Sequence, residues 1–323
     1  MNLVVTGGSG FIGSNFIDYR LTHQPDDKII NIDKLTYASN PWFNRAAKKS
    51  KNYQFKKVDI FEKEELESAM NDVDCVVNFA AESHVDRSIA NPKEFIKSNV
   101  YGVYNLLELA RKKDFRFHQV STDEVYGALD SIHTSSFTEE SAYNPKNPYS
   151  ATKASADFLV RSYVNTYGIK ATISNCGNNF GPHQHPEKLI PKTIIYAIRN
   201  LKVPLYGDGR QIRDWVYVED HCSAIDTILN KGRLGKTYLI GASNEIENIE
   251  LVKNILKILN KGEDLIDFVN DRPGHDIRYS LSWRRIKEEL GWSPVHSFNE
   301  ALLNTVEHYR KNFEIYLNMM VTH

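Results

Sequence analysis

The sequence predicts an α/β fold in which a doubly wound parallel sheet is followed by a smaller α/β part. In the first half of the chain, short apolar runs alternate with segments whose apolar residues recur at helical spacing. This alternation is typical of parallel strands joined by crossover helices. Beyond residue 178, prolines and turn-forming residues interrupt the alternation, which indicates a second and less regular part of the chain.

The predicted elements of the first half follow this alternation. Runs rich in Val, Ile and Phe indicate buried strands at residues 2–6, 28–33, 75–81, 117–122 and 170–176, and another strand is expected to end at residues 58–60. Helices are predicted at residues 11–23, 62–71, 94–113 and 149–168, the last stopped by Gly168. The helix at 94–113 is expected to bury a face that carries Val100, Val103, Tyr104, Leu107 and Ala110.

The second half is organised differently. Pro182, Pro186, Pro191 and Pro204 break the chain. Helices are expected afterwards at residues 219–230, 248–260, 282–290 and 298–311. We therefore expect two interleaved domains, one formed by residues 1–178 with 214–242 and the other by residues 179–213 with 243–323.

Composition argues against several classes of protein. The chain has 323 residues, enough for a substantial core, and its net charge of −1 indicates neither a nucleic-acid partner nor a membrane. No apolar run approaches the ~20 residues of a membrane-spanning helix, and no secretory signal is expected. The three cysteines are far apart and odd in number, so we expect no metal site and a reducing, cytoplasmic setting.

A glycine-rich string, TGGSGFIG, lies between the first predicted strand and the first predicted helix. Gly8, Gly10 and Gly13 fit the spacing G-x-G-x-x-G, and Gly7, Gly10 and Gly13 fit a wider repeat. Glycines at such a turn let the backbone and the helix N-terminus approach a pyrophosphate. A glycine triad alone is weak support, because turns are often rich in glycine for structural reasons.

Asp33 strengthens this interpretation. It ends the second predicted strand, twenty residues after Gly13. A carboxylate at that position accepts hydrogen bonds from the ribose hydroxyls and repels a 2′-phosphate. The pattern predicts a Rossmann-like domain that binds NAD rather than NADP, although an ordinary strand end or helix cap would also accommodate an aspartate.

Tyr149 and Lys153 are four residues apart on a predicted helix, so their side chains share a face. A nearby ammonium is expected to lower the pKa of Tyr149 into the range of a general base. Such a base takes the proton of a sugar hydroxyl while the carbon gives a hydride to NAD, and Thr122 is placed to hold the same hydroxyl. Taken alone, the pattern also fits a partly buried aromatic beside a solvated lysine, and Thr122 fits a structural hydrogen bond.

Asp123 and Glu124 follow the predicted strand at 117–122 directly, and ligands of parallel sheets bind at the carboxyl ends of the strands. Once a sugar carbon is oxidised to a ketone, a carboxylate can remove the acidified neighbouring proton. A carboxylic acid can then protonate a leaving hydroxyl. The pair therefore predicts elimination of water, although two acids in an exposed loop are the commonest use of such a dipeptide.

With these residues established, the chain resembles the nucleoside-diphosphate-glucose 4,6-dehydratases of the extended short-chain dehydrogenase/reductase family. The matching strings are TGGSGFIGSNF, IDKLTYASN, AAESHVDRSI, STDEVYG, NPYSATKA, GNNFGPHQHPEKLIP, YGDGRQIRDWVYVEDH and DRPGHDIRY. The resemblance implies a hydro-lyase with tightly bound NAD. Its substrate would be dTDP-glucose or UDP-glucose, its product the 4-keto-6-deoxy-glucose nucleotide, and the choice of base stays open.

The resemblance also implies a role for each matching residue. Tyr149 would take the O4 proton with help from Lys153 and Thr122. Glu124 would take the C5 proton, Asp123 would protonate the departing 6-hydroxyl, and the hydride would return to C6. NAD contacts are implied for Gly7, Gly10, Phe11, Ile12, Gly13, Asp33, Lys34, Leu35, Thr36, Asp59, Ile60, Ala80, Ala81, Ser98, Tyr149, Lys153 and Asn179. Substrate contacts are implied for Ser83, Thr122, Asn178, Lys188, Leu189, Tyr206, Arg213, Asn248, Arg272 and His275.

Three of the substrate contacts have simpler interpretations. Arg213 and Arg272 suit a diphosphate, because a guanidinium forks onto phosphate oxygens, but single arginines more often form surface salt bridges. His275, beside Pro273 and Gly274, also fits an ordinary loop. The resemblance further implies a homodimer formed through the helices near 94–113 and 149–167, although core burial explains their apolar faces equally well.

Two other functions compete with dehydration. An NAD-dependent sugar-nucleotide 4-epimerase would share the fold, the glycines, Tyr149 and Lys153, but it needs no acid pair. A catalytically silent NAD-binding protein would need the nucleotide fold but none of the catalytic side chains. The intact set of Thr122, Asp123, Glu124, Tyr149 and Lys153 argues against a silent protein.

Overall fold

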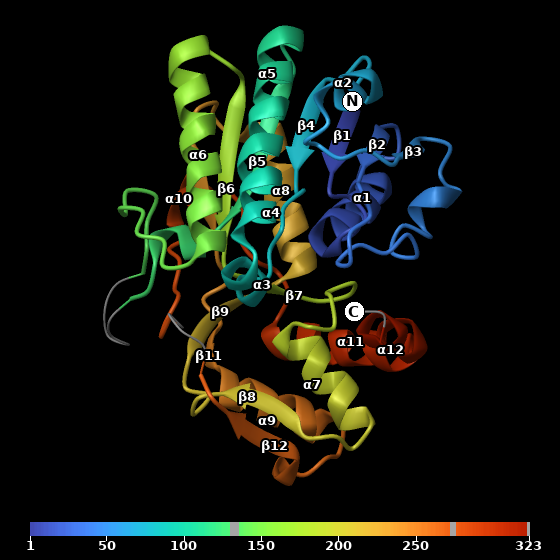
Figure 1. Cartoon of the computed structure of the whole chain (residues 1–323), viewed down its shortest axis with the longest axis vertical. Coiled ribbons are helices and arrows are strands. Elements are labelled where there is room, and N and C mark those ends of the chain that lie inside the picture. The colour runs from blue at the N-terminus through green and yellow to red at the C-terminus, as the bar shows by residue number, and fades with distance from the viewer. Residues whose placement is uncertain (130–135, 272–275, 322–323) are drawn as a thin grey trace.

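The computed structural model describes residues 1–129, 136–271 and 276–321, and its centre is a seven-stranded sheet (Figure 1). The strand order is β10-β6-β5-β4-β1-β2-β3, and every pairing in it is parallel. The strands are β1 (Asn2–Thr6), β2 (Lys28–Ile32), β3 (Tyr53–Lys56), β4 (Cys75–Asn78), β5 (Arg116–Thr122), β6 (Ala171–Cys176) and β10 (Thr237–Ile240). The predicted doubly wound parallel sheet is confirmed.

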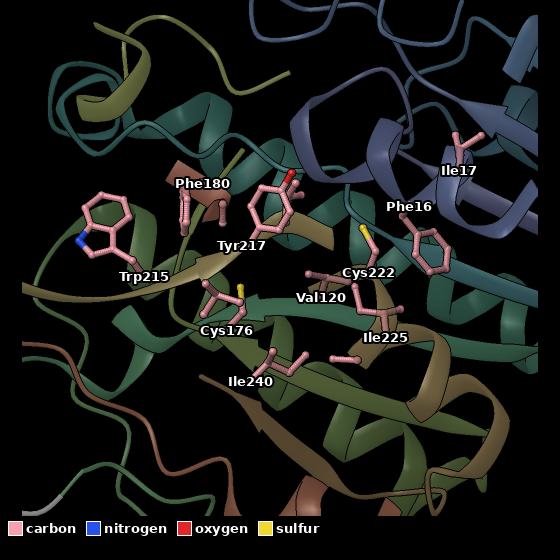
Figure 2. Packing of buried hydrophobic residues seen from close by; sticks show 14 of the residues in the cluster. Phe16, Ile17, Val120, Cys176, Phe180, Trp215, Tyr217, Cys222, Ile225 and Ile240 are labelled. Carbon is pink, nitrogen blue, oxygen red and sulfur yellow. The ribbon is translucent and has the colours of Figure 1, made fainter. Parts of the chain in front are cut away.

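Helices cover both faces of this sheet. They are α1 (Phe11–His23), α2 (Lys63–Ala69), α3 (Val85–Ala90), α4 (Pro92–Ile96), α5 (Val103–Lys113), α6 (Pro148–Tyr167) and α8 (Val218–Lys231). Successive side chains of β1 pack on opposite faces of the sheet. Leu3 and Val5 belong to a buried cluster with α1 and α8, whereas Val4 belongs to a cluster with α2, α5 and α6. Figure 2 shows the first cluster, where Val120 of the sheet lies near Ile225 of α8.

The rest of the chain forms the smaller part, seen in the lower half of Figure 1. Strands β7 (Asn178–Phe180), β9 (Ile212–Tyr217) and β11 (Glu245–Glu247) form one sheet, and β8 (Val203–Tyr206) pairs with β12 (Ile266–Val269). The helices of this part are α7 (Leu189–Ile198), α9 (Asn248–Ile258), α11 (Phe298–Lys311) and α12 (Phe313–Val321), whereas α10 (Arg284–Leu290) packs against β10 and α8 of the larger part. Short helical turns occur in both parts of the structure. They are η1 (Ala47–Lys49), η2 (Lys97–Gly102) and η3 (Asp123–Tyr126) in the larger part and η4 (Glu263–Leu265) in the smaller part. The proposed domain boundaries stay a prediction.

The expected helix at 94–113 is confirmed as a continuous helical segment, but it is not α-helical throughout. It is divided into α4, the π-helical turn η2 and α5. A Cβ on Gly102, where η2 ends, would collide with the side chain of Ile60. Of the residues expected on the buried face, Val103, Leu107 and Ala110 are buried, Val100 is half-buried, and Tyr104 is exposed. Likewise, β3 ends at Lys56, before the residues 58–60 expected to end it.

Among the residues described, every helix is too short or too polar to cross a bilayer.

Candidate active site

The turn between β1 and α1 forms one wall of a large cavity at the carboxyl end of the sheet. Gly7 has φ +71°, and a Cβ there would lie 2.6 Å from the backbone nitrogen of Ala80. A Cβ on Gly13 would collide with the carbonyl oxygen of Gly7. No side chain caps the N-terminus of α1, so this helix end can offer its amides to a phosphate.

Asp33 follows β2 and lies on the same wall. Its Oδ2 accepts a hydrogen bond from the Ser9 amide at 2.9 Å, and its Oδ1 accepts one from the Leu35 amide at 2.8 Å. Burial raises the pKa of this carboxyl, and the two amide hydrogen bonds oppose that rise. The carboxyl group is therefore fixed in orientation, and its remaining lone pairs suit ribose hydroxyls.

The residues with an implied NAD contact are brought together by the fold. All of them line this cavity except Leu35, whose main chain instead orients Asp33. Three features fit a dinucleotide. They are the tight turn, where a Cβ on Gly7 or Gly13 would collide with the backbone, the uncapped N-terminus of α1, and the fixed carboxyl group of Asp33. The residues present thus suit NAD.

The five predicted catalytic residues line the same cavity. Thr122 ends β5 and caps η3 by accepting a hydrogen bond from the Glu124 amide at 3.3 Å. Asp123 and Glu124 occupy the first turn of η3. Tyr149 and Lys153 come from α6, whose first turn is fixed by a capping box at Asn147.

The two acids have different surroundings. Asp123 is 2% exposed and accepts a hydrogen bond from Thr122 Oγ1 at 3.1 Å on Oδ1, while its Oδ2 is buried without a partner among the described residues. Burial, and then the charge of Glu124, raise the pKa of Asp123 well above its usual value. Glu124 is half-buried and accepts a hydrogen bond from Asn147 Nδ2 at 3.3 Å. The geometry therefore favours the protonated form of Asp123.

The pKa of Tyr149 differs in direction from the predicted one. Burial raises its pKa well above the usual value, the charge of Glu124 adds to the rise, and a hydrogen bond with Thr122 opposes it. Lys153 Nζ donates to the carbonyl oxygen of Val120 at 2.7 Å. The expected net lowering of the Tyr149 pKa is therefore wrong in this arrangement, because burial and the charge of Glu124 raise that pKa.

The implied substrate residues divide into two groups. Ser83, Thr122, Asn178 and Lys188 line the cavity, and Leu189 begins α7 directly after Lys188. Tyr206, Arg213 and Asn248 do not line it. Arg272 and His275 lie outside the described residues.

Arg213 is neither a surface arginine nor a cavity residue. It is 4% exposed, and its guanidinium donates to the carbonyl oxygens of Ile212 at 2.8 Å and Asp276 at 2.9 Å. The guanidinium also lies 4.5 Å from the ring centroid of Tyr279. The alternative of a surface salt bridge is therefore wrong, and a diphosphate contact stays a prediction.

Tyr206 and Asn248 lie in the smaller part. The Tyr206 hydroxyl donates to Asp86 Oδ2 of α3 at 3.4 Å, which places its tip against the larger part. The amide of Asn248 donates to the Gln211 carbonyl at 3.0 Å, and its buried Oδ1 accepts no hydrogen bond from the described residues. Their substrate contacts stay predictions.

Sequence reasoning missed several cavity residues, which are Ile32, Ala38, Ser39, Val58, Phe79, Glu82, Val120, Ser121, Cys176, Gly177, Gln184, His185 and Glu187. Most of them are neighbours of residues that were predicted. Glu187 is the most connected of the set. Its carboxylate accepts a hydrogen bond from the Tyr37 hydroxyl at 3.4 Å and lies 3.4 Å from His84 Nε2 and 3.6 Å from Arg87 Nε. Its position in the string PEK was a signal that could have identified it.

Comparisons with known proteins agree with this geometry. The family model described as GDP-mannose 4,6 dehydratase matches residues 4–305. The dTDP-glucose 4,6-dehydratase of Haemophilus influenzae is 47% identical over 335 aligned positions, which cover 97% of this chain and 98% of that protein. The crystal structure of dTDP-glucose 4,6-dehydratase from Streptomyces venezuelae, with NAD bound, has a TM-score of 0.96 at 42% identity, with 99% of this chain and 100% of that chain covered.

A structure with a different activity is also similar. UDP-glucose 4-epimerase from Thermotoga maritima has a TM-score of 0.89 at 28% identity, with 97% of this chain and 100% of that chain covered. The fold alone therefore does not separate the two reactions.

Proposed function

The chain belongs to the nucleoside-diphosphate-glucose 4,6-dehydratases of the extended short-chain dehydrogenase/reductase family, and from this premise we propose that it dehydrates dTDP-glucose or UDP-glucose with bound NAD. The product is the 4-keto-6-deoxy-glucose nucleotide. One observation supports dehydration above the other reactions of this fold. Asp123 and Glu124 share a cavity with Tyr149 and the dinucleotide turn, and epimerisation at C4 requires no such acid pair.

The protein's own residues move three protons in this reaction. Tyr149 takes the O4 proton, with Thr122 holding the same hydroxyl and Lys153 favouring the phenolate. NAD, when bound, would supply the acceptor for the C4 hydride and the donor of the same hydride to C6. Glu124 takes the proton from C5, which the new ketone has made acidic. Asp123 gives its proton to the 6-hydroxyl, which leaves as water. Glu124 returns its proton to C5 when C6 receives the hydride, which restores the C5–H bond of the product.

The environments of the two acids support this division of labour. A carboxyl group that stays protonated near neutral pH is suited to be the acid, and burial raises the pKa of Asp123 in that sense. Glu124 is half-buried and held by Asn147, which is compatible with an ionised base. The names of the relatives favour the thymidine nucleotide over the uridine nucleotide. One methyl group in an apolar pocket is worth only about 1–3 kcal/mol.

We also propose that the chain acts as a homodimer in the cytoplasm. Several large apolar side chains are exposed on α3, α4, η2, α5 and α6, and these elements contact one another. Such patches on a protein surface often mark an interface. The three cysteines are all unpaired and buried, which suits a reducing compartment.

The decisive experiment is a paired incubation of the purified protein with dTDP-glucose and with UDP-glucose, without added NADH, followed by mass spectrometry. We expect loss of one water without stoichiometric release of NADH, and the ratio of initial rates identifies the preferred base. Tyr149→Phe should lose turnover, whereas Tyr167→Phe, at the exposed far end of the same helix, should retain it. A new isomer without loss of water would identify an epimerase instead.

A further inference from the structure

Asp157 on α6 is a buried carboxylate beside the catalytic pair that the proposed reaction does not use. It is fully buried, and it follows Lys153 by four residues, so the two side chains share a face of the helix. Its Oδ2 accepts hydrogen bonds from Ser121 Oγ at 2.8 Å, from the Tyr143 hydroxyl at 3.0 Å and from Asn175 Nδ2 at 3.1 Å. A carboxylate in so dry a position is costly unless its charge is compensated.

These contacts connect α6 to the end of β5, from which the acid pair emerges. Lys153 Nζ donates to the carbonyl oxygen of Val120, and Asp157 accepts from the next residue, Ser121. Asn175 Nδ2 donates both to Asp157 and to the carbonyl oxygen of Thr122, the latter at 3.1 Å. Val120 and Ser121 of β5 are thereby bonded to α6 directly, and Thr122 is linked to Asp157 through Asn175 of β6.

We propose that Asp157 is a positioning residue that acts through Lys153, because its buried negative charge keeps that lysine protonated next to Tyr149. Its hydrogen bonds also hold Thr122 and the acid pair at a fixed distance from α6. This inference rests on the proposed function only where catalysis is measured.

The electrostatics of the pair agree with the geometry. Burial lowers the pKa of Lys153, and the charge of Asp157 is the largest influence that opposes this. Conversely, burial raises the pKa of Asp157, and the charge of Lys153 is the largest opposing influence. With Asp157 neutral, Lys153 would lose its proton at a lower pH, and the ammonium that favours the phenolate of Tyr149 would be lost.

The other titratable groups around the pair do not replace this charge. They are Arg161 on α6, Cys176 on β6, Tyr126 on η3 and Tyr143 in the segment before α6. Burial raises the pKa of Cys176 to about 12 and raises the pKa of both tyrosines, so these three groups are neutral near pH 7. Arg161 donates to the Tyr143 hydroxyl at 2.9 Å, on the side of Asp157 away from Lys153.

The first test needs no substrate. Lysine side chains are labelled with ¹³C, the Lys153 resonance is assigned with Lys153→Arg, and its chemical shift is followed against pH. In Asp157→Asn, which keeps an oxygen acceptor but removes the charge, we expect the Lys153 midpoint to fall by about one pH unit. Tyr143→Phe removes one hydrogen bond to the same carboxylate and should leave the midpoint unchanged. An unchanged midpoint in Asp157→Asn would overturn the proposal.

The second test uses catalysis. Because Lys153 would lose its proton at a lower pH in Asp157→Asn, the alkaline side of the pH profile of kcat/KM should move downward by about one unit, a loss of about tenfold at a fixed pH on that side. A purely structural carboxylate would lower the rate equally at every pH, which would contradict the proposal. If Asp157→Asn does not fold, Asp157→Ser carries both tests. If the wild type dehydrates neither sugar nucleotide, the proposed function fails, and the lysine titration alone decides the role of Asp157.

Discussion

Two adjacent residues at the end of β5 differ in what surrounds them, and that difference decides which is the acid and which is the base. The main chain turns into η3 at Thr122, which directs Asp123 into the interior and leaves Glu124 half-buried. A buried carboxyl resists ionisation, and a neighbouring negative charge adds to the effect. The assignment follows from burial, since the two side chains have nearly the same chemistry.

Substitution of each acid should arrest the reaction at a different proton transfer. Glu124→Gln should still oxidise C4 but should not remove the C5 proton, whereas Asp123→Asn should remove that proton but fail to expel the hydroxyl. Each loss should lower turnover on the order of a hundredfold or more. In D₂O, Asp123→Asn should therefore incorporate deuterium at C5 of the recovered sugar, and Glu124→Gln should not. Deuterium incorporation in Glu124→Gln alone would reverse the two roles.

The sequence predicts which residues take part, but not how they titrate. The spacing of Tyr149 and Lys153 and the order of Thr122, Asp123 and Glu124 are readable because they are local. The rise in the Tyr149 pKa is not readable, because it depends on burial in a small cluster with Val85 and Phe95. The role proposed for Asp157 is not readable for the same reason, because its hydrogen-bond partners come from β5, β6 and the loop before α6.

At the scale of elements, the start of α6 links helix stability to the active site. Asn147 Oδ1 accepts a hydrogen bond from the Ser150 amide at 2.9 Å, which caps the helix, and Asn147 Nδ2 donates to Glu124 at 3.3 Å. One side chain thus fixes both the helix that carries Tyr149 and the carboxylate proposed as the base.

Substitutions at Asn147 should separate these two effects. Asn147→Ala should lose about 1 kcal/mol of unfolding free energy with the cap. Asn147→Asp keeps the acceptor but sets a second carboxylate beside Glu124, which disfavours the ionised form of that base and should move the acid side of the pH profile upward.

Asn147→Ser provides the matched control, because it keeps a capping oxygen without adding charge. Urea unfolding and the pH dependence of kcat/KM measure the two effects separately. If Asn147→Asp and Asn147→Ser had the same pH profile, the link between this cap and Glu124 would be absent.

The π-helical turn inside the 94–113 helix could not be predicted from the sequence. The apolar residues of this helix recur at ordinary helical spacing, so nothing local indicates the π-helical turn. Two distant contacts accompany the turn: Gly102 lies against Ile60, and Asn99 Nδ2 donates to Thr152 of α6 at 3.0 Å. Both contacts join segments that are far apart in the sequence, so the 94–113 stretch alone does not reveal them.

At the scale of the molecule, contacts between segments far apart in sequence surround the cavity. Glu187, just before α7, meets Tyr37, His84 and Arg87 of the first hundred residues. The parallel sheet could be predicted because its strands share one simple pattern. These cross-contacts could not, because charged and polar residues in loops carry no periodicity.

An exposed apolar patch, defined here as Ile89, Ile96, Tyr101, Tyr104 and Phe158, lies on α3, α4, η2, α5 and α6. These helices contact one another, and α5 and α6 stand side by side in Figure 1. A surface this apolar over neighbouring helices is expected to be covered by a second copy of the chain.

Light scattering coupled to gel filtration should therefore find a dimer, and Tyr101→Glu combined with Phe158→Glu should yield a monomer, because two buried unpaired charges oppose association. Leu303 is an exposed residue of α11, outside the patch. The Leu303→Glu variant should therefore remain dimeric. The monomer should also lose activity and melt at a lower temperature, since α6 carries Tyr149 and Lys153 into the cavity while carrying Phe158 in the patch. A wild type that is monomeric at micromolar concentration, or a Leu303→Glu variant that dissociates equally, would contradict this assembly.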